Sequence, residues 1–249
     1  MGLDRRELVG PFDVIGDVHG CADELGELLD TLGYTVQQGV RRHPQGRRAV
    51  FVGDVVNRGP CNLATVDIVA PMVRAGSALG VRGNHDHKVL ERLRDEHREP
   101  WAELAALPDD ERRRRRRELA TFLASLDPYL ILDGGRLVVA HAGLPEAMHG
   151  LDTSVVRRFA QIGRPLGKRH PDGRPMRWDW AQEYHGTALV VYGHTPVDRP
   201  RWVNTTVNVD TGCVYGGALT ALRYPERESV AVAAHATHYQ PKRRDGPVV

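Results

Sequence analysis

Six polar side chains in this sequence could bind a metal ion, and each stands directly beside a glycine or an alanine. They are Asp17, His19, Asp54, Asn84, His141 and His194. Carboxylate and amide oxygens combined with imidazole nitrogens suit borderline divalent cations such as Mn²⁺, Fe²⁺ or Zn²⁺. A pair of such ions needs at least one bridging carboxylate. Asp54, which follows the middle one of three expected strands, is the natural bridge.

Short hydrophobic runs alternate with helical patterns in the first third of the chain. Residues 12–16, 48–53 and 77–81 have the composition of buried strands, and residues 25–32 and 62–74 have apolar side chains at helical spacing. This order predicts an α/β fold, with sheet strands flanked by helices. Crossovers of one hand bring successive strand ends to the same edge of a sheet, where α/β folds build their sites. The polar residues are therefore expected to meet, although each one alone is more simply explained as a turn residue.

The rest of the chain consists of a charged helical segment and a strand-rich half. Residues 87–127 are charged and almost free of β-branched side chains, which predicts a helical insert. Within residues 128–235, strands are expected at 136–140, 188–193, 202–210, 218–224 and 229–234. Residues 143–186 are rich in glycine, proline and arginine, so we expect a loop-rich cap over the site. Residues 1–249 are expected to form a single domain.

The composition is that of an ordinary globular protein. With 41% hydrophobic and 27% charged residues over 249 positions, the chain can bury a full core. The formal net charge of +2 neither favours nor excludes a nucleic-acid partner. The three cysteines, Cys21, Cys61 and Cys213, have no paired spacing, which argues against a disulfide framework and a cysteine zinc knuckle. No apolar leader or membrane-spanning stretch is visible, so a cytoplasmic location is expected.

Five motifs carry a family resemblance: GDVHG, GDVVNRG, GNHD, HAG and GHT. In this order they resemble the signature of the phosphoprotein-phosphatase-like metallophosphoesterases, and the likeness extends over most of the chain. Within that superfamily the sequence is most similar to the bacterial PrpE-type dinucleoside tetraphosphatases and, equally, to the phosphatase module of bacterial polynucleotide kinase-phosphatases. The resemblance implies a calcineurin-like sandwich of two mixed β-sheets flanked by helices, and hydrolysis of a phosphate ester or anhydride by metal-bound hydroxide.

The resemblance also assigns a role to each motif residue. It implies one metal held by Asp17, His19 and Asp54, and a second held by Asp54, Asn84, His141 and His194. His85 falls where the family has its leaving-group acid. Arg58 falls where the family has a phosphate clamp, and Asn84 is expected to contact substrate as well. Asp210 is expected to lie just behind the ligands. Two divalent cations are implied, with Mn²⁺ the first choice and Fe²⁺, Zn²⁺, Ni²⁺ and Co²⁺ as alternatives.

Asn57 departs from the family pattern GDxxDRG, which has an acid at this position. In the family that acid pairs with the motif histidine and keeps it cationic. An opposite charge raises the pKa of a histidine, whereas a neutral amide does not. We therefore expect an intact metal site and a weakened general acid at His85. The loss should be largest for alkoxide leaving groups and small for a pyrophosphate, which favours an anhydride substrate.

The expected activity is that of a metal-dependent phosphatase, first of all a dinucleoside tetraphosphate (Ap4A-type) hydrolase, because the chain ends where the stand-alone PrpE-type enzymes end. One alternative is a 3′-phosphatase or 2′,3′-cyclic phosphodiesterase acting on RNA or DNA ends. No GxxxxGK[ST] pattern occurs, which excludes a self-contained kinase-phosphatase. Further alternatives are a phosphoprotein phosphatase and a catalytically weakened nucleotide sensor; for the sensor, Asn57 is the only sequence support.

The arginine run Arg112–Arg117 allows two interpretations. Six consecutive arginines surround a helix, and the apolar stripe that follows them predicts a helix packed along one face, with the arginine heads in water. If the helix borders the site, the run would instead concentrate anions or bind nucleic acid there. The solvated helix is the favoured interpretation.

Overall fold

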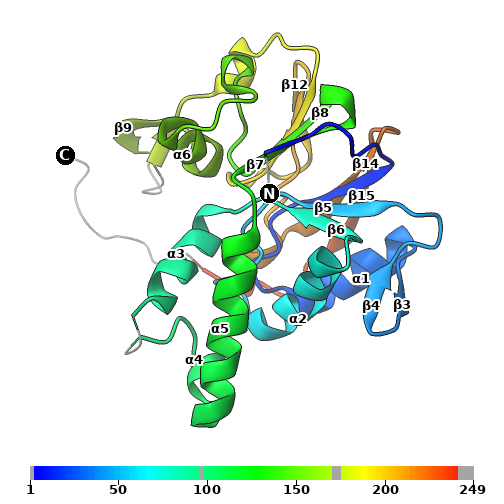
Figure 1. Cartoon of the computed structure of the whole chain (residues 1–249). Coiled ribbons are helices and arrows are strands. Elements are labelled where there is room, and N and C mark those ends of the chain that lie inside the picture. The colour runs from blue at the N-terminus through cyan, green and yellow to red at the C-terminus, as the bar shows by residue number, and fades with distance from the viewer. Residues whose placement is uncertain (1–2, 96–97, 170–174, 241–249) are drawn as a thin grey trace.

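The computed structural model describes residues 3–95, 98–169 and 175–240, and consists of two packed β-sheets with helices on both outer sides (Figure 1). The first sheet has the strand order β15-β14-β2-β5-β6, and the second has the order β1-β7-β8-β11-β13-β12. The first comprises β2 (Phe12–Ile15), β5 (Arg48–Phe51), β6 (Ala78–Gly80), β14 (Ala218–Tyr224) and β15 (Glu228–Ala233). The second comprises β1 (Asp4–Arg5), β7 (Tyr129–Leu132), β8 (Leu137–Ala140), β11 (Leu189–Tyr192), β12 (Arg201–Val203) and β13 (Thr206–Asn208). The expected sandwich of two mixed sheets is confirmed.

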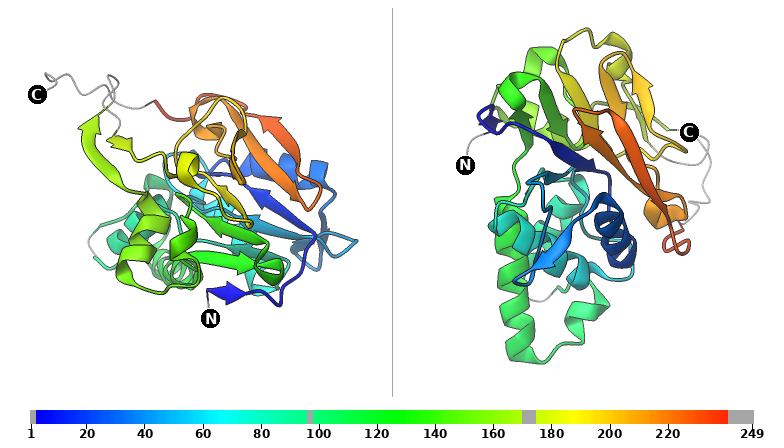
Figure 2. Two further views of the ribbon diagram at one scale, coloured as in Figure 1. Left: turned by 90° about the horizontal axis from the view of Figure 1, so that it is seen from above. Right: turned by 90° about the vertical axis from the view of Figure 1, so that its right-hand side faces the viewer.

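Three hydrophobic clusters define the layers. Alternate side chains of both sheets, among them Val14, Val50 and Val139, form the cluster between the sheets. A second cluster packs α1 (Ala22–Leu32) and α2 (Asn62–Arg74) against the outer face of the first sheet. A third packs α6 (Ser154–Ile162) against the outer face of the second sheet. The helices α1 and α2 thus lie on the opposite side of the sandwich from α6 (Figure 2).

The helical insert begins earlier than expected. Helix α3 spans Asn84–Leu93, and α4 (Ala102–Ala105) and α5 (Asp109–Ser125) follow, with residues 96–97 outside the described part. The first turn of α3 therefore contains part of the GNHD motif. Helix α5 runs past the edge of the sheets, with α4 at its far end (Figures 1 and 2).

The arginine run lies on α5 and is engaged in ion pairs there. Arg115 pairs with Asp67 of α2 at 2.7 Å, and Arg116 pairs with Glu99 at 2.7 Å. Arg116 also donates to the carbonyl oxygen of Leu93 at 2.9 Å, at the end of α3. These contacts support the interpretation of α5 as a packed helix with its arginines paired at the surface.

Two expectations for the second half need correction. The expected strand 202–210 is a hairpin of β12 and β13, since Asn204 adopts a left-handed φ of 49° and turns the chain. The segment 143–186, expected to be loop-rich, contains α6 and the hairpin of β9 (Pro165–Arg169) and β10 (Pro175–Arg177), with residues 170–174 outside the described part. Thr153 caps α6 by accepting from the backbone N–H of Val156.

The remaining elements are short. Strands β3 (Thr35–Gln37) and β4 (Val40–Arg42) form a ribbon, and 3₁₀ turns lie at Asp133–Gly135, Glu146–Met148, Trp180–Glu183 and Cys213–Tyr215. None of the helices described over 3–95, 98–169 and 175–240 combines the length and the hydropathy needed to span a membrane.

A buried ion-pair network holds the start of β2. Removing its central arginine should therefore destabilise the fold strongly. Arg47 donates to Asp13 at 2.9 Å and to Glu226 at 2.8 Å, and Asp13 is fully buried. Arg47→Met would leave the Asp13 charge without its main partner, so we expect the free energy of unfolding to fall by about 3–5 kcal/mol. Glu226→Gln, which changes the exposed partner, should cost about 1 kcal/mol or less. Urea denaturation of both variants measures the difference, and equal losses would contradict this account.

Candidate metal centre

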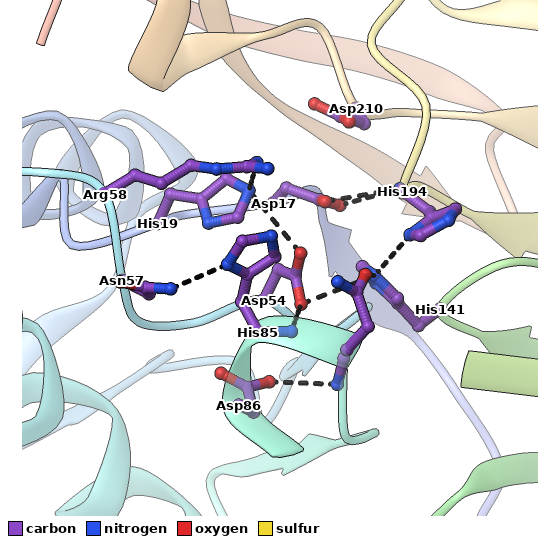
Figure 3. A network of polar contacts seen from close by, with 12 residues as sticks. Asp17, His19, Asp54, Asn57, Arg58, His85, Asp86, His141, His194 and Asp210 are labelled. Atoms are coloured by element: carbon purple, nitrogen blue, oxygen red, sulfur yellow. Dashed lines mark hydrogen bonds and ion pairs between the residues drawn. The ribbon is translucent and has the colours of Figure 1, made fainter. Parts of the chain in front are cut away.

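The chemistry-bearing side chains gather where strands from both sheets end. Asp17 follows β2, Asp54 follows β5, and Asn84 opens α3 after β6. The second sheet contributes three more, which follow β8, β11 and β13: His141, His194 and Asp210. Strands β2, β5 and β6 are parallel neighbours, as are β8, β11 and β13, so their carboxyl ends meet at one edge (Figure 3). The structure thus brings together all six metal-binding residues predicted from the sequence.

Asp54 lies at the centre of the group. Its Oδ2 is 3.5 Å from Nε2 of His19, and its Oδ1 is 3.4 Å from Nε2 of His141. The backbone N–H of His85 donates to Oδ1 at 2.7 Å, which fixes the carboxylate. Asp17, His19 and Asp54 offer ligand atoms that all lie within 4.8 Å of one another. The two oxygens of Asp54 therefore face two different groups of donors, as a bridging carboxylate requires.

On the second side, imidazole nitrogens and an amide oxygen converge at short distances. Nε2 of His141 lies 3.0 Å from Oδ1 of Asn84 and 3.0 Å from Nδ1 of His194. Nδ1 of His141 is 3.1 Å from the carbonyl oxygen of Val52 and donates to it, which leaves Nε2 with a free lone pair. Nε2 of His194 is buried and lacks a hydrogen-bond partner within the described residues. A cation between these atoms would satisfy them, so the donor set fits a divalent metal ion.

The pKa values of the buried carboxyl groups also indicate a cation site. Burial, followed by the charges of Asp210 and Asp54, raises the pKa of Asp17 well above its usual range. Burial also raises the pKa of Asp210 to about 6. For Asp54, burial alone would raise the pKa, but His141 and His85 hold it well below its usual range. Divalent cations would remove the repulsion among these three carboxylates.

Glycines beside the ligands make this close approach possible. A Cβ at Gly83 would lie 2.1 Å from Oδ1 of Asp54, and a Cβ at Gly193 would lie 2.0 Å from Oδ1 of Asp17. The ligands themselves are strained, since His19, Asp54 and His194 adopt left-handed φ values of 50°, 49° and 73°. Such strain is common at functional sites. The glycines of GNHD and GHT are therefore sterically required.

Arg58 and His85 flank the metal-binding group. The guanidinium of Arg58 donates to Nε2 of His19 at 3.0 Å and lies 5.5 Å from the ring centres of both Tyr215 and Tyr239. Burial lowers the pKa of His19 to about 4, so the ring is neutral, and a metal ion at Nε2 would take the place of the hydrogen bond from Arg58. The two tyrosine rings restrict the guanidinium beside the group.

Asn57 is the hydrogen-bond partner of His85. The Nδ2 atom of Asn57 lies 2.7 Å from Nδ1 of His85. With the amide donating, the proton of neutral His85 is on Nε2. Burial, followed by the charge of Arg58 and opposed by Asp54, lowers the pKa of His85 to about 3. His85 is thus oriented by Asn57 and neutral at pH 7.

Asp86 links the GNHD loop to the GDVVNRG loop. Its position in the sequence does not indicate this link. It accepts from the backbone N–H of Gly83 at 2.9 Å and from that of Val56 at 3.2 Å. Asp210, by contrast, accepts from the N–H of Gly212 at 3.1 Å and lies near the ligands, with no hydrogen bond to a ligating histidine among the described residues. Its influence on the ligands is therefore electrostatic.

A pocket of about 890 Å³ opens from the centre along α3. Three cations, Arg58, Lys88 and Arg92, contribute to its lining. Two aromatic side chains, Trp101 and Tyr239, line it as well. The acid Glu103 is already engaged, since it accepts from the backbone N–H groups of Asn62 and Leu63 at the start of α2. The pocket therefore offers cations and aromatic faces to a ligand that extends from the metal centre.

Sequence inspection missed this pocket, although part of its signal was present. His85, Lys88 and Arg92 are spaced three and four residues apart, so they share one face of α3. Trp101 and Tyr239 come from distant segments, and nothing local to them indicates that they meet.

Comparison with known proteins adds four similarities. Residues 10–236 match the family model described as calcineurin-like phosphoesterase. The chain is 44% identical over 240 residues to the asymmetrical bis(5′-nucleosyl)-tetraphosphatase PrpE of Geobacillus thermodenitrificans, covering 94% of this chain and 98% of that protein. The PrpE of Bacillus subtilis is 42% identical over 228 residues, covering 89% and 93%. A crystal structure of a candidate diadenosine tetraphosphatase superposes with a TM-score of 0.67 at 27% identity, covering 93% of this chain and 97% of that one.

Proposed function

The chain belongs to the calcineurin-like phosphoesterase family and is a metal-dependent phosphohydrolase, and we propose that it hydrolyses bis(5′-nucleosyl) tetraphosphates asymmetrically. The products would be a nucleoside triphosphate and a nucleoside monophosphate. The names of relatives that match over nearly their whole length support this substrate. The observation that carries the proposal is the pocket beside His85, whose cations and aromatic rings suit a phosphate chain that ends in a base.

Divalent ions are required throughout this family, and we propose a manganese pair. One ion would be held by Asp17, His19 and Asp54, and the other by Asp54, Asn84, His141 and His194. The oxygen and nitrogen donors, with no sulfur among them, favour Mn²⁺ over softer ions. When bound, such ions activate water and neutralise the charge that develops on phosphate. Because the ligands come from both sheets, residues 1–249 would act as one catalytic domain.

The chain's own residues would bind and orient the phosphate under attack. Arg58 presents a planar fork of donors to its oxygens, with the two tyrosines limiting its motion. The amide nitrogen of Asn84 can donate to the same phosphate while Oδ1 faces His141. Water attacks phosphorus and the bond to the bridging oxygen breaks. The leaving triphosphate departs as an anion that needs little protonation, which is compatible with a neutral His85.

The rest of the substrate would follow α3. Lys88 and Arg92 would pair with the remaining phosphates, and a base would stack on Trp101 or Tyr239. This arrangement reserves the pocket for a long anionic chain. A simple phosphate monoester would leave most of it empty.

A side-by-side assay tests this proposal. We expect kcat/KM of the Mn²⁺-loaded protein to be much higher for diadenosine tetraphosphate (Ap4A) than for a 3′-phosphorylated oligonucleotide or an aryl phosphate. A preference for the oligonucleotide would make the protein a nucleic-acid end phosphatase. If no substrate turns over although metal is bound, the protein is a sensor.

Removing an aromatic face of the pocket should weaken the binding of a nucleotide more than the binding of a small phosphate ester. Tyr239→Ala is expected to raise KM for Ap4A by the equivalent of about 1–3 kcal/mol, the contribution of one stacked base. For an aryl phosphate, which lacks a base, KM should rise much less, because the substitution acts there only through the freed Arg58 side chain. Trp202→Ala, which removes an exposed ring on β12, is the matched control and should change neither value. An equal rise of KM for both substrates in Tyr239→Ala would show that the ring is not a base platform.

A further inference from the structure

A second cluster of metal-binding atoms lies beside the start of α1, outside the catalytic centre. Cys21 precedes α1, Glu24 lies in its first turn, and Cys213 opens the 3₁₀ turn Cys213–Tyr215. One ligand atom from each of these three residues lies within 4.8 Å of the other two. Nε2 of His238, from the segment after β15, is 2.7 Å from Oε1 of Glu24. Two sulfurs and one oxygen thus lie together from two distant parts of the chain, and His238 from a third part pairs with the carboxylate.

The chemistry of this group differs from that of the catalytic centre. Structural zinc sites are closed by four protein ligands, and sulfur together with imidazole is their usual donor set. The catalytic ligands contain no sulfur, so the two sites would select different ions. We propose that Cys21, Glu24, Cys213 and His238 form a structural binding site for a zinc ion.

The carboxylate of Glu24 lies beside the two thiols and is paired there, since it accepts from the backbone N–H of His235 at 2.9 Å and lies 2.7 Å from Nε2 of His238. Cys21 and Cys213 belong to the hydrophobic cluster under the first sheet, and Glu24 is only 1% exposed. A buried carboxylate is costly unless it is paired or coordinates a metal ion. The hydrogen bond between the Cys213 thiol and Cys21, followed by burial, raises the pKa of the Cys213 thiol, so without an ion the thiol stays protonated. Zinc would displace that proton and neutralise Glu24 at the same time.

The ion would fasten the C-terminal segment to the body of the protein. At present the segment is tied by backbone bonds from His235 to Glu24 at 2.9 Å and from Tyr239 to the carbonyl of Val214 at 2.9 Å. Tyr239 is the neighbour of His238 and lies against Arg58. A ligand bond to His238 would therefore hold Tyr239 in place beside the catalytic centre.

Cobalt spectroscopy of the full chain tests the site without measuring activity. Co²⁺ bound by thiolates gives a near-ultraviolet charge-transfer band, which the oxygen and nitrogen ligands of the catalytic centre cannot produce. We expect this band on titration with Co²⁺, and its loss on addition of Zn²⁺. Cys213→Ala should abolish it and lower the bound metal by one ion per chain. Cys61→Ala, which removes the cysteine outside the cluster, should leave it unchanged.

A second variant keeps both thiols, so it tests the site even if Cys213→Ala fails to fold. His238→Ala should retain the band but weaken Co²⁺ binding at this site by at least about tenfold, because the loss of a ligand should cost no less than the loss of a group behind the ligands. The proposal is overturned if saturating Co²⁺ gives no thiolate band, or if the band persists in Cys213→Ala. It is also overturned if His238→Ala binds Co²⁺ as tightly as the parent, or if the two thiols prove to be a disulfide in metal-free protein.

Discussion

Asp54→Asn is expected to lower kcat/KM for Ap4A by about a thousandfold or more, the largest effect of any single substitution in this account. Metal ions contribute several kcal/mol of transition-state stabilisation, and each 1.36 kcal/mol corresponds to a factor of about ten. Asp54 faces His19 with one oxygen and His141 with the other, so its charge would serve both ions. An uncharged amide at this position should bind both ions more weakly than the carboxylate. Steady-state kinetics and the metal content of the purified variant measure the two effects.

Asp210→Asn is the comparison variant for that experiment, with a smaller expected loss of activity. Asp210 is buried near the proposed ion sites but, among the described residues, makes no hydrogen bond to His19, His141 or His194. We expect a loss of about 10- to 100-fold, which is typical when a group behind the ligands is changed. If Asp210→Asn were as damaging as Asp54→Asn, Asp210 would be a ligand. If Asp54→Asn kept full metal content and activity, the bridging assignment would be wrong.

Asn57→Asp is expected to raise the rate on an alkyl phosphate by about 100-fold and to change the rate on Ap4A little. General acid catalysis contributes about 10²- to 10⁴-fold when the leaving group needs a proton. In the wild-type protein a neutral amide lies 2.7 Å from Nδ1 of His85, whose pKa is lowered to about 3. A carboxylate at this point would raise the pKa of His85 and keep its acid form at higher pH. The falling limb of the pH–rate profile for the alkyl phosphate should therefore move to higher pH.

A neutral substitution separates charge from orientation at this position. Asn57→Ser keeps a small polar group but adds no charge, so it should give no gain on the alkyl phosphate. Rates plotted against leaving-group pKa should be steep for wild type and Asn57→Ser, and shallow for Asn57→Asp. An equally steep plot for Asn57→Asp would refute the weakened-acid explanation.

Most of the first sheet could be predicted from the sequence because its strands are short hydrophobic runs, and glycines follow β2 and β5 closely. Strands β2 and β5, helix α2 and strand β14 lie where the pattern predicts them. The hairpin β12–β13 was missed because neither glycine nor proline marks its turn at Asn204. Strand β7 was missed because its run Tyr129–Leu132 follows the apolar end of α5 almost without interruption.

The metal-binding group could be predicted from the sequence, whereas the pocket could not. Each candidate ligand lies within four residues of the end of a strand, and parallel strands place their ends together. The pocket and the cysteine cluster depend on contacts between segments far apart in the chain, such as Arg58 with Tyr239 and Glu24 with His238. Cysteine spacing therefore gave no sign that Cys21 and Cys213 meet. Such contacts leave no local pattern in composition or periodicity.

The most direct test of the proposed function is the identity of the products formed from Ap4A. Chromatography of the reaction should show ATP and AMP in equal amounts, with turnover abolished by a chelator and restored by Mn²⁺. ADP as the sole product would contradict asymmetrical cleavage. Turnover that persists in the chelator would contradict the metal-dependent mechanism itself.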